Sequence, residues 1–145
     1  MTHRHRWAHR ARAALLAMGM GAGLALPAAA QTVRCHVSYG GVTKVFAAPP
    51  VSNPYDAPVQ AEGSFFLFRA VNQVEPLDLA SVKVYVYAAL DSGPRLIHQG
   101  SWLASQTPQS GARTPHGFTG LHAVYEPVRD GELHYWCERV DAPAR

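Results

Sequence analysis

The chain has 145 residues, 16% of them charged, with 13 lysine and arginine residues against 10 acidic ones. Four of the basic residues precede residue 31, so residues 31–145 hold 9 basic and 10 acidic side chains. That balance gives no general attraction for nucleic acid or for an anionic membrane, and we expect neither as a partner. The 115 residues after position 30 are enough for one domain with a limited core.

The N-terminus has the three parts of a cleavable signal peptide. A basic segment, 1–12, is followed by an uncharged, mostly apolar run over 13–26 and by three small alanines at 28–30. A helix needs about 20 apolar residues to cross a bilayer, so this run is too short for a permanent anchor. We expect residues 1–30 to be removed near Ala30-Gln31, leaving 31–145 as one exported domain, periplasmic or secreted, with no membrane insertion.

Seven segments after the signal peptide have the alternating or continuous apolar pattern of β-strands. They are 33–39, 42–47, 64–71, 81–90, 95–104, 118–125 and 132–140. The prolines of 49–58 predict an extended loop. A single helical turn is expected over 77–80, because Pro76 and Asp78 are residues that favour the start of a helix. The pattern therefore predicts an all-β fold, a small antiparallel β-sandwich that is immunoglobulin-like or an irregular barrel.

The only two cysteines, Cys35 and Cys137, lie near the two ends of the expected domain. An exported chain meets oxidising conditions, and two thiols without a C-x-x-C spacing make a poor redox or zinc site. We therefore expect one structural disulfide, with the first and last strands side by side or facing. The segment Tyr135-Trp136-Cys137 resembles immunoglobulin-like domains, in which a tyrosine precedes the second cysteine by two residues.

Sequence motifs for catalysis or for a cofactor are missing from the chain. It has no G-x-S-x-G, H-E-x-x-H, S-x-x-K or phosphate-binding glycine loop, and we expect no cofactor. Serine, histidine and aspartate are all present, so a catalytic site assembled in space stays open, as in a small exported hydrolase.

The alternation of side chains along the last three strands predicts one surface that carries histidines and tryptophans. In each of the last three strands, the more apolar side is expected to face the core. Those core-facing residues are Ile97 and Leu103, then Leu121, Ala123 and Tyr125, then Leu133, Tyr135 and Cys137. The opposite sides carry His98 and Trp102, then His122, then His134 and Trp136. On adjacent strands these five residues would form one histidine–aromatic surface.

Three interpretations of this surface stay open. The residues can be ordinary exterior positions of a sandwich. They can form a contact surface for a protein, peptide or glycan, because tryptophan is enriched at contact sites. They can also hold a metal ion through His98, His122 and His134, because imidazole binds zinc and copper. A binding module is the leading hypothesis, and a histidine-based metal-binding protein is the alternative.

Overall fold

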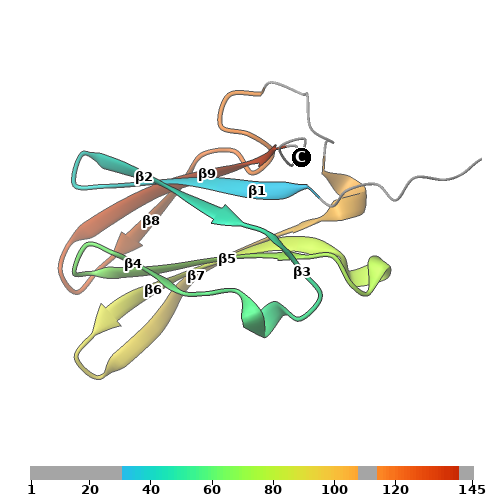
Figure 1. Cartoon of the computed structure of the whole chain (residues 1–145). Coiled ribbons are helices and arrows are strands. Elements are labelled where there is room, and N and C mark those ends of the chain that lie inside the picture. The colour runs from blue at the N-terminus through green and yellow to red at the C-terminus, as the bar shows by residue number, and fades with distance from the viewer. Residues whose placement is uncertain (1–30, 108–113, 141–145) are drawn as a thin grey trace, which may run out of the picture.

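The computed structural model describes residues 31–107 and 114–140, and the expected signal peptide lies outside these ranges. The described chain is all-β, with nine strands in two sheets and three single-turn 3-10 helices. Figure 1 shows the two sheets as stacked layers, so the prediction of a small antiparallel sandwich is confirmed. Within the described ranges, no helix is long and apolar enough to cross a membrane.

The first sheet has the strand order β2-β1-β9-β8 and is antiparallel throughout. Its strands are β1 (Thr32–Tyr39), β2 (Val42–Ala48), β8 (His122–Glu126) and β9 (Gly131–Val140). Gly40 and Gly41 close the β1–β2 hairpin with positive φ angles of 58° and 79°, which glycine adopts without steric cost. The first and last strands of the domain, β1 and β9, therefore lie side by side at the centre of this sheet.

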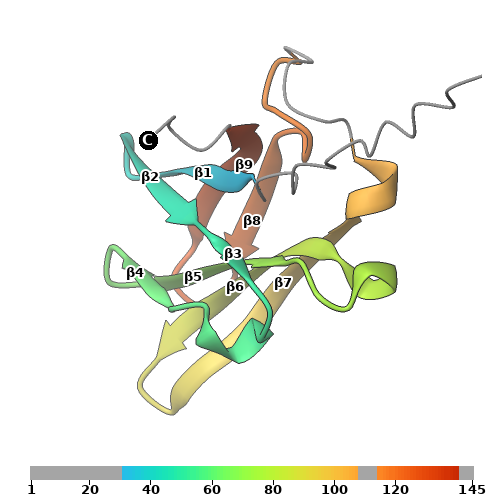
Figure 2. The ribbon, with the colours of Figure 1, turned by 45° about the vertical axis from the view of Figure 1, so that its right-hand side comes forward.

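The second sheet has the order β3-β5-β6-β7, and β4 also pairs with β5. Its strands are β3 (Pro50–Val51), β4 (Gln60–Glu62), β5 (Phe66–Gln73), β6 (Ser81–Leu90) and β7 (Gly93–Leu103). The 3-10 turns are η1 (Pro54–Asp56), η2 (Leu77–Leu79) and η3 (Ala104–Gln106). The chain crosses from this sheet to the first one between β7 and β8 (Figure 2).

Two differences from the predicted strands have clear physical reasons. The proline-containing segment holds the short strand β3, because Pro50 starts an edge strand, where its missing N–H is tolerated, and a second short strand, β4, follows it. The strand predicted over 118–125 begins only at His122, because Gly117 and Gly120 bend the chain with φ angles of 61° and 74°. The structure thus has nine strands where the pattern predicted about seven.

The core fills the space between the two sheets. Its fully buried apolar side chains come from four strands: Val33 and Val37 of β1, Phe66 and Phe68 of β5, Val82, Val84 and Val86 of β6, and Leu133 of β9. Each such side chain contributes about 1.5–3 kcal/mol relative to an exposed one. The alternation along β1 and β9 means that every second residue of these strands faces solvent.

Cys35 and Cys137 are directly opposite each other on β1 and β9, and their sulfur atoms are bonded. The predicted disulfide is therefore confirmed. It joins neighbouring strands of one sheet, with a Cα–Cα distance of 4.0 Å, whereas the disulfide of immunoglobulin domains connects the two sheets. The resemblance around Cys137 does not extend to the position of the bond.

Candidate functional site

All five histidines of residues 31–145 lie in two clusters on opposite faces of the first sheet. The clusters are organised by two adjacent residues of β9, Tyr135 and Trp136. The first cluster, called the Tyr135 cluster, contains His98, Trp102, Phe118, His122 and Tyr135. The second, called the Trp136 face, contains Arg34, His36, Ser38, His116, Leu121, His134, Trp136 and Glu138.

The prediction that all three strand histidines share one surface with the tryptophans is wrong. His134 and Trp136 are on the solvent face of the first sheet, opposite the buried Tyr135, as predicted for β9. His98, Trp102 and His122 instead contact one another or Tyr135 on the inner face. The error lies in β7 and β8. Ile97 packs against the core as expected, but Leu103, Leu121 and Tyr125 are exposed, and His98, Trp102 and His122 face inward instead.

In β8, the buried residues are Val124 and Glu126, while Tyr125 and Leu121, the residue just before this strand, are each 53% exposed. Glu126 has no exposed surface, and its carboxylate accepts hydrogen bonds from the backbone N–H groups of Val128 (3.0 Å) and Arg129 (2.8 Å). These bonds satisfy a buried charge and close the turn into β9. An acidic residue thus occupies a core position. The side of β8 that faces the core is therefore the opposite of the side predicted from its apolar residues.

In β7, a β-bulge at Ile97 shifts the register between Val86 and Tyr87 of the neighbouring strand. After the bulge, His98 pairs with Val86 and Trp102 pairs with Val82, both of which are fully buried. His98 and Trp102 therefore face inward, and Leu103 is exposed. One inserted residue is enough to exchange the two sides of a strand.

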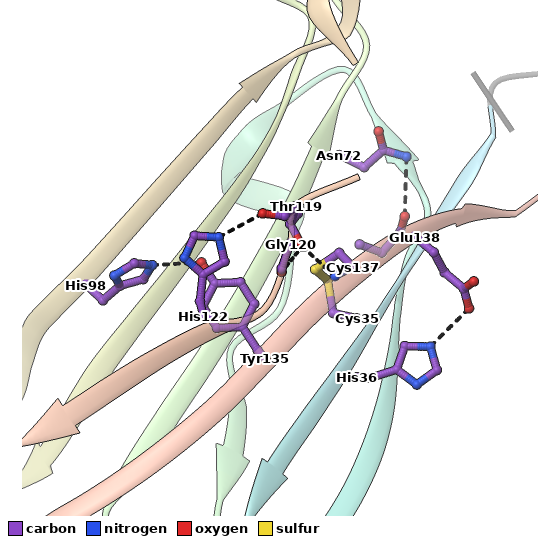
Figure 3. The surroundings of a disulfide bond; sticks show 11 residues. Cys35, His36, Asn72, His98, Thr119, Gly120, His122, Tyr135, Cys137 and Glu138 are labelled. Carbon is purple, nitrogen blue, oxygen red and sulfur yellow. Dashed lines mark hydrogen bonds and ion pairs between the residues drawn. A yellow bond between two sulfur atoms is a disulfide. The ribbon is translucent and has the colours of Figure 1, made fainter. Parts of the chain in front are cut away.

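The Tyr135 cluster fills the side of the sandwich where β7 and β8 approach each other. The Tyr135 hydroxyl lies 2.7 Å from Nε2 of His98, and the His122 ring stacks on the phenol ring with centroids 4.9 Å apart. The His122 ring donates its Nε2–H to the carbonyl oxygen of Thr119 at 3.0 Å. Figure 3 shows both histidines beside Tyr135, with the disulfide to their right.

Burial sets the protonation states in this cluster. Burial raises the pKa of Tyr135, so the phenol keeps its proton. Burial, and then the neighbouring His122, lower the pKa of His98, which favours the neutral imidazole. The hydrogen bond between the phenol and Nε2 of a neutral His98 runs from the phenol when the imidazole proton is on Nδ1, and from Nε2–H when it is on Nε2. Because Tyr135 is fully buried, the arrangement satisfies polar groups in the core and offers no accessible nucleophile.

The Trp136 face is built from pairs of opposite residues on β1 and β9. His36 lies opposite Trp136, and Ser38 lies opposite His134. The His36 ring stacks on the indole with centroids 3.8 Å apart and an interplanar angle of 5°. His36 Nε2 lies 3.0 Å from Oε1 of Glu138 (Figure 3), and Arg34 is 3.5 Å from the same oxygen. One side of the indole is therefore covered by an imidazole that also contacts the Glu138 carboxylate.

The turn over 114–117 adds a third histidine to this face. The Gly117 N–H donates to the Thr114 carbonyl at 3.1 Å, and His116 has a φ of 65°, a left-handed conformation that costs a non-glycine residue about 1–2 kcal/mol. The His116 ring lies edge-on to Trp136, with centroids 6.0 Å apart. A turn that holds a histidine where glycine would be easier points to a role for the side chain.

This turn is fixed to β9 immediately after Trp136. The backbone N–H of Phe118 donates to the Cys137 carbonyl at 3.0 Å, and Thr119 Oγ1 accepts from the Cys137 N–H at 2.8 Å. A Cβ atom on Gly117 would lie 2.1 Å from the Cys137 carbonyl oxygen, so only glycine permits this approach. The turn that carries His116 is thus anchored to β9 beside the indole.

A surface depression of about 350 Å³ opens between these elements. Its lining residues are Ser38, His116, Leu121, His134 and Trp136. His134 Nε2 lies 2.9 Å from Oε1 of Glu132, and the Ser38 hydroxyl lies 2.7 Å from Thr43 Oγ1. Ser38 contacts Thr43, and no histidine of the described residues is hydrogen-bonded to it, so the serine–histidine pair typical of nucleophilic catalysis is not formed here.

The three histidines named as an alternative metal site do not converge. His98 and His122 are on the inner face of the first sheet, and His134 is on its outer face. Over residues 31–107 and 114–140, no three histidine, cysteine or acidic side chains are arranged to hold a metal ion. The proposed ligand set of His98, His122 and His134 is therefore wrong.

Sequence reasoning missed His36 and His116. His36 had a usable signal, because a disulfide between directly opposite cysteines on antiparallel strands sets the register of every other pair. His36, one residue after Cys35, must then face Trp136, one residue before Cys137. His116 had no comparable signal, since it lies in a loop whose path depends on the contacts of Gly117 with β9.

Comparisons with protein-family models, with curated proteins and with solved structures find nothing that matches this chain. The fold and the two clusters therefore define its class: a small, disulfide-bonded, all-β sandwich with an imidazole–indole depression on one sheet.

Proposed function

We propose that this protein is an exported binding module, periplasmic or secreted, whose ligand site is the Trp136 face. The observation that carries the proposal is the grouping of three of the five histidines of residues 31–145 around one solvent-side tryptophan. An indole with polar neighbours is typical of contact sites, because it offers a large, rigid, partly polar surface.

The rigidity of the face supports the same proposal. The disulfide lies under it, and the His116 turn is pinned to β9 by two hydrogen bonds at Cys137. A preformed site loses little conformational freedom on binding. The exported location is supported by the disulfide, which persists in oxidising compartments.

The test compares matched aromatic substitutions in the exported protein. The Trp136→Ala variant and a control variant, Tyr55→Ala, are immobilised beside the wild type and exposed to extract from the producing cells. Tyr55 is a suitable control because it is 85% exposed and lies in η1, on the second sheet's side of the molecule. A component retained by the wild type and by Tyr55→Ala, but not by a folded Trp136→Ala, supports the proposal. Retention by all three proteins contradicts it.

A further inference from the structure

The position of the depression limits how a ligand can bind there. The flanking strands β1 and β9 are central in the first sheet, not edge strands. β1 is paired along both sides, while β9 is paired with β1 and, on its other side, with β8 and then with the segment 117–119. A peptide cannot extend the sheet at this point, because strand addition needs a free edge. The ligand must therefore contact side chains.

The lining side chains suit hydroxyl-rich ligands. The indole of Trp136 offers an aromatic surface, His116 and His134 offer imidazoles, and Ser38 offers a hydroxyl. A neutral imidazole has one donor and one acceptor nitrogen, and a hydroxyl can act in both ways. The His116 ring makes no hydrogen bond or ion pair with the described residues, so both of its nitrogens are available. Sugar hydroxyls present the same mixture of donors and acceptors, and the C–H side of a sugar ring is apolar like the indole.

Charged side chains lie around the depression but do not line it, since its described lining residues include no lysine, arginine, aspartate or glutamate. The arginine of the Trp136 face, Arg34, is already paired with Glu138. Glu132 is in contact with His134. No fixed cation is therefore available for an anionic ligand at neutral pH, which favours an uncharged ligand.

We infer that the depression at Trp136 binds a neutral sugar residue of a glycan, stacked against the indole and hydrogen-bonded by His116 and His134. This inference rests on the proposed function, since it names the ligand class of the same site. His116 is then a ligand-contacting residue, which explains why the turn keeps a histidine at a φ of 65°.

The test follows the indole N–H signals of the isotope-labelled exported protein by NMR. The expected mature chain has two tryptophans, Trp102 and Trp136, so the Trp102 signal is an internal control. The probes are glucose, N-acetylglucosamine and short β-linked oligomers of each, with glucuronate as the anionic comparison. At about pH 7.5, where an exposed imidazole is mostly neutral, a neutral probe should move the Trp136 signal and leave Trp102 unchanged.

The His116→Gly variant separates binding from folding. Glycine adopts the turn conformation without strain, so the unfolding midpoint should stay equal or rise. Neutral-sugar affinity should fall about fivefold, which corresponds to one lost hydrogen bond. A variant that is equally stable and binds equally well would contradict a contact role for His116.

The remaining outcomes identify which statement fails. A larger response to glucuronate than to any neutral probe, or a response only to added peptides, overturns the inference in favour of an acidic or a protein ligand. Absence of any response to all neutral probes also overturns it. If capture in the preceding experiment still depends on Trp136, only the ligand class is wrong. If capture does not depend on Trp136, the proposed function itself fails.

Discussion

Tyr135 and Trp136 are adjacent on β9, yet their side chains organise opposite faces of the first sheet. Tyr135 is fully buried and hydrogen-bonded to His98, while Trp136 stacks on His36 at the solvent face. The alternation of a β-strand sends the two rings to opposite faces, with Tyr135 on the buried face that also holds the Cys35–Cys137 bond and Trp136 on the outer face. The domain thus separates an internal imidazole cluster, which supports the fold, from an external one, which we propose binds a ligand.

The Tyr135 hydroxyl should contribute measurably to stability. In Tyr135→Phe, His98 loses its partner, and the free energy of unfolding should fall by about 1 kcal/mol, lowering the thermal midpoint by about 4 °C. Thermal unfolding followed by circular dichroism measures the change. Tyr87→Phe is the matched control, because Tyr87 lies on the outer face of the second sheet. Equal midpoints for the two variants would show that the bond to His98 contributes nothing.

Stability should fall with decreasing pH because of His98. Burial and His122 lower the folded-state pKa of His98 below its ordinary value of 6.5, so the folded state binds fewer protons than the unfolded state. The stabilising contribution is therefore present above about pH 6.5 and is lost as the pH falls through the lower folded value. Tyr135 and His122 face His98, and neither supplies a compensating negative charge.

Urea unfolding at a series of pH values tests this dependence. His98→Gln keeps a hydrogen-bonding side chain but cannot titrate, so its stability should change less between about pH 7.5 and 5 than that of the wild type. The same slope in both proteins would assign the pH dependence to other groups.

Gly100 provides the space in which Trp102 and Tyr135 pack. A Cβ atom at this position would lie 2.3 Å from Cη2 of Trp102 and 3.1 Å from the Tyr135 hydroxyl. Gly100→Ala should therefore cost about 1–3 kcal/mol, as in overpacked cores. Ser101→Ala is the neighbouring control, because Ser101 is exposed on the other side of β7. Denaturant unfolding should show a loss only for Gly100→Ala, and an unchanged midpoint would mean that Trp102 has room to move.

The start of the mature protein is also testable. The small residues at 28–30 after a short apolar run predict a chain that begins at Gln31. The intact mass of the exported protein should correspond to residues 31–145. A membrane-bound product that retains its first residues would refute cleavage and, with it, the proposed exported location.

The fold could be predicted from the sequence because strand positions depend on local alternation and turn residues. The disulfide could be predicted because the expected domain has only two cysteines. Which side of β7 and of β8 faces the core could not be predicted, because tertiary contacts decide the bulge at Ile97 and the burial of the Glu126 carboxylate. These two features moved His98 and His122 from the expected outer surface to the core.

The candidate site was partly predictable for a related reason. His134 and Trp136 lie on β9, where the alternation of apolar and polar residues clearly indicates the outer side. The position of His36 opposite Trp136 can be deduced once Cys35 is known to pair with Cys137. His116 depends on the fit of Gly117 against the backbone of Cys137, which no periodic pattern in the sequence encodes.

The central claim is that the Trp136 face binds the ligand of this protein, and the most direct test is ligand capture by Trp136→Ala against Tyr55→Ala. Both variants must first show wild-type circular dichroism, because Trp136 also contacts His36 and His116. Our account predicts that the captured component is lost with Trp136→Ala and retained with Tyr55→Ala. Undiminished capture by a folded Trp136→Ala protein would contradict it.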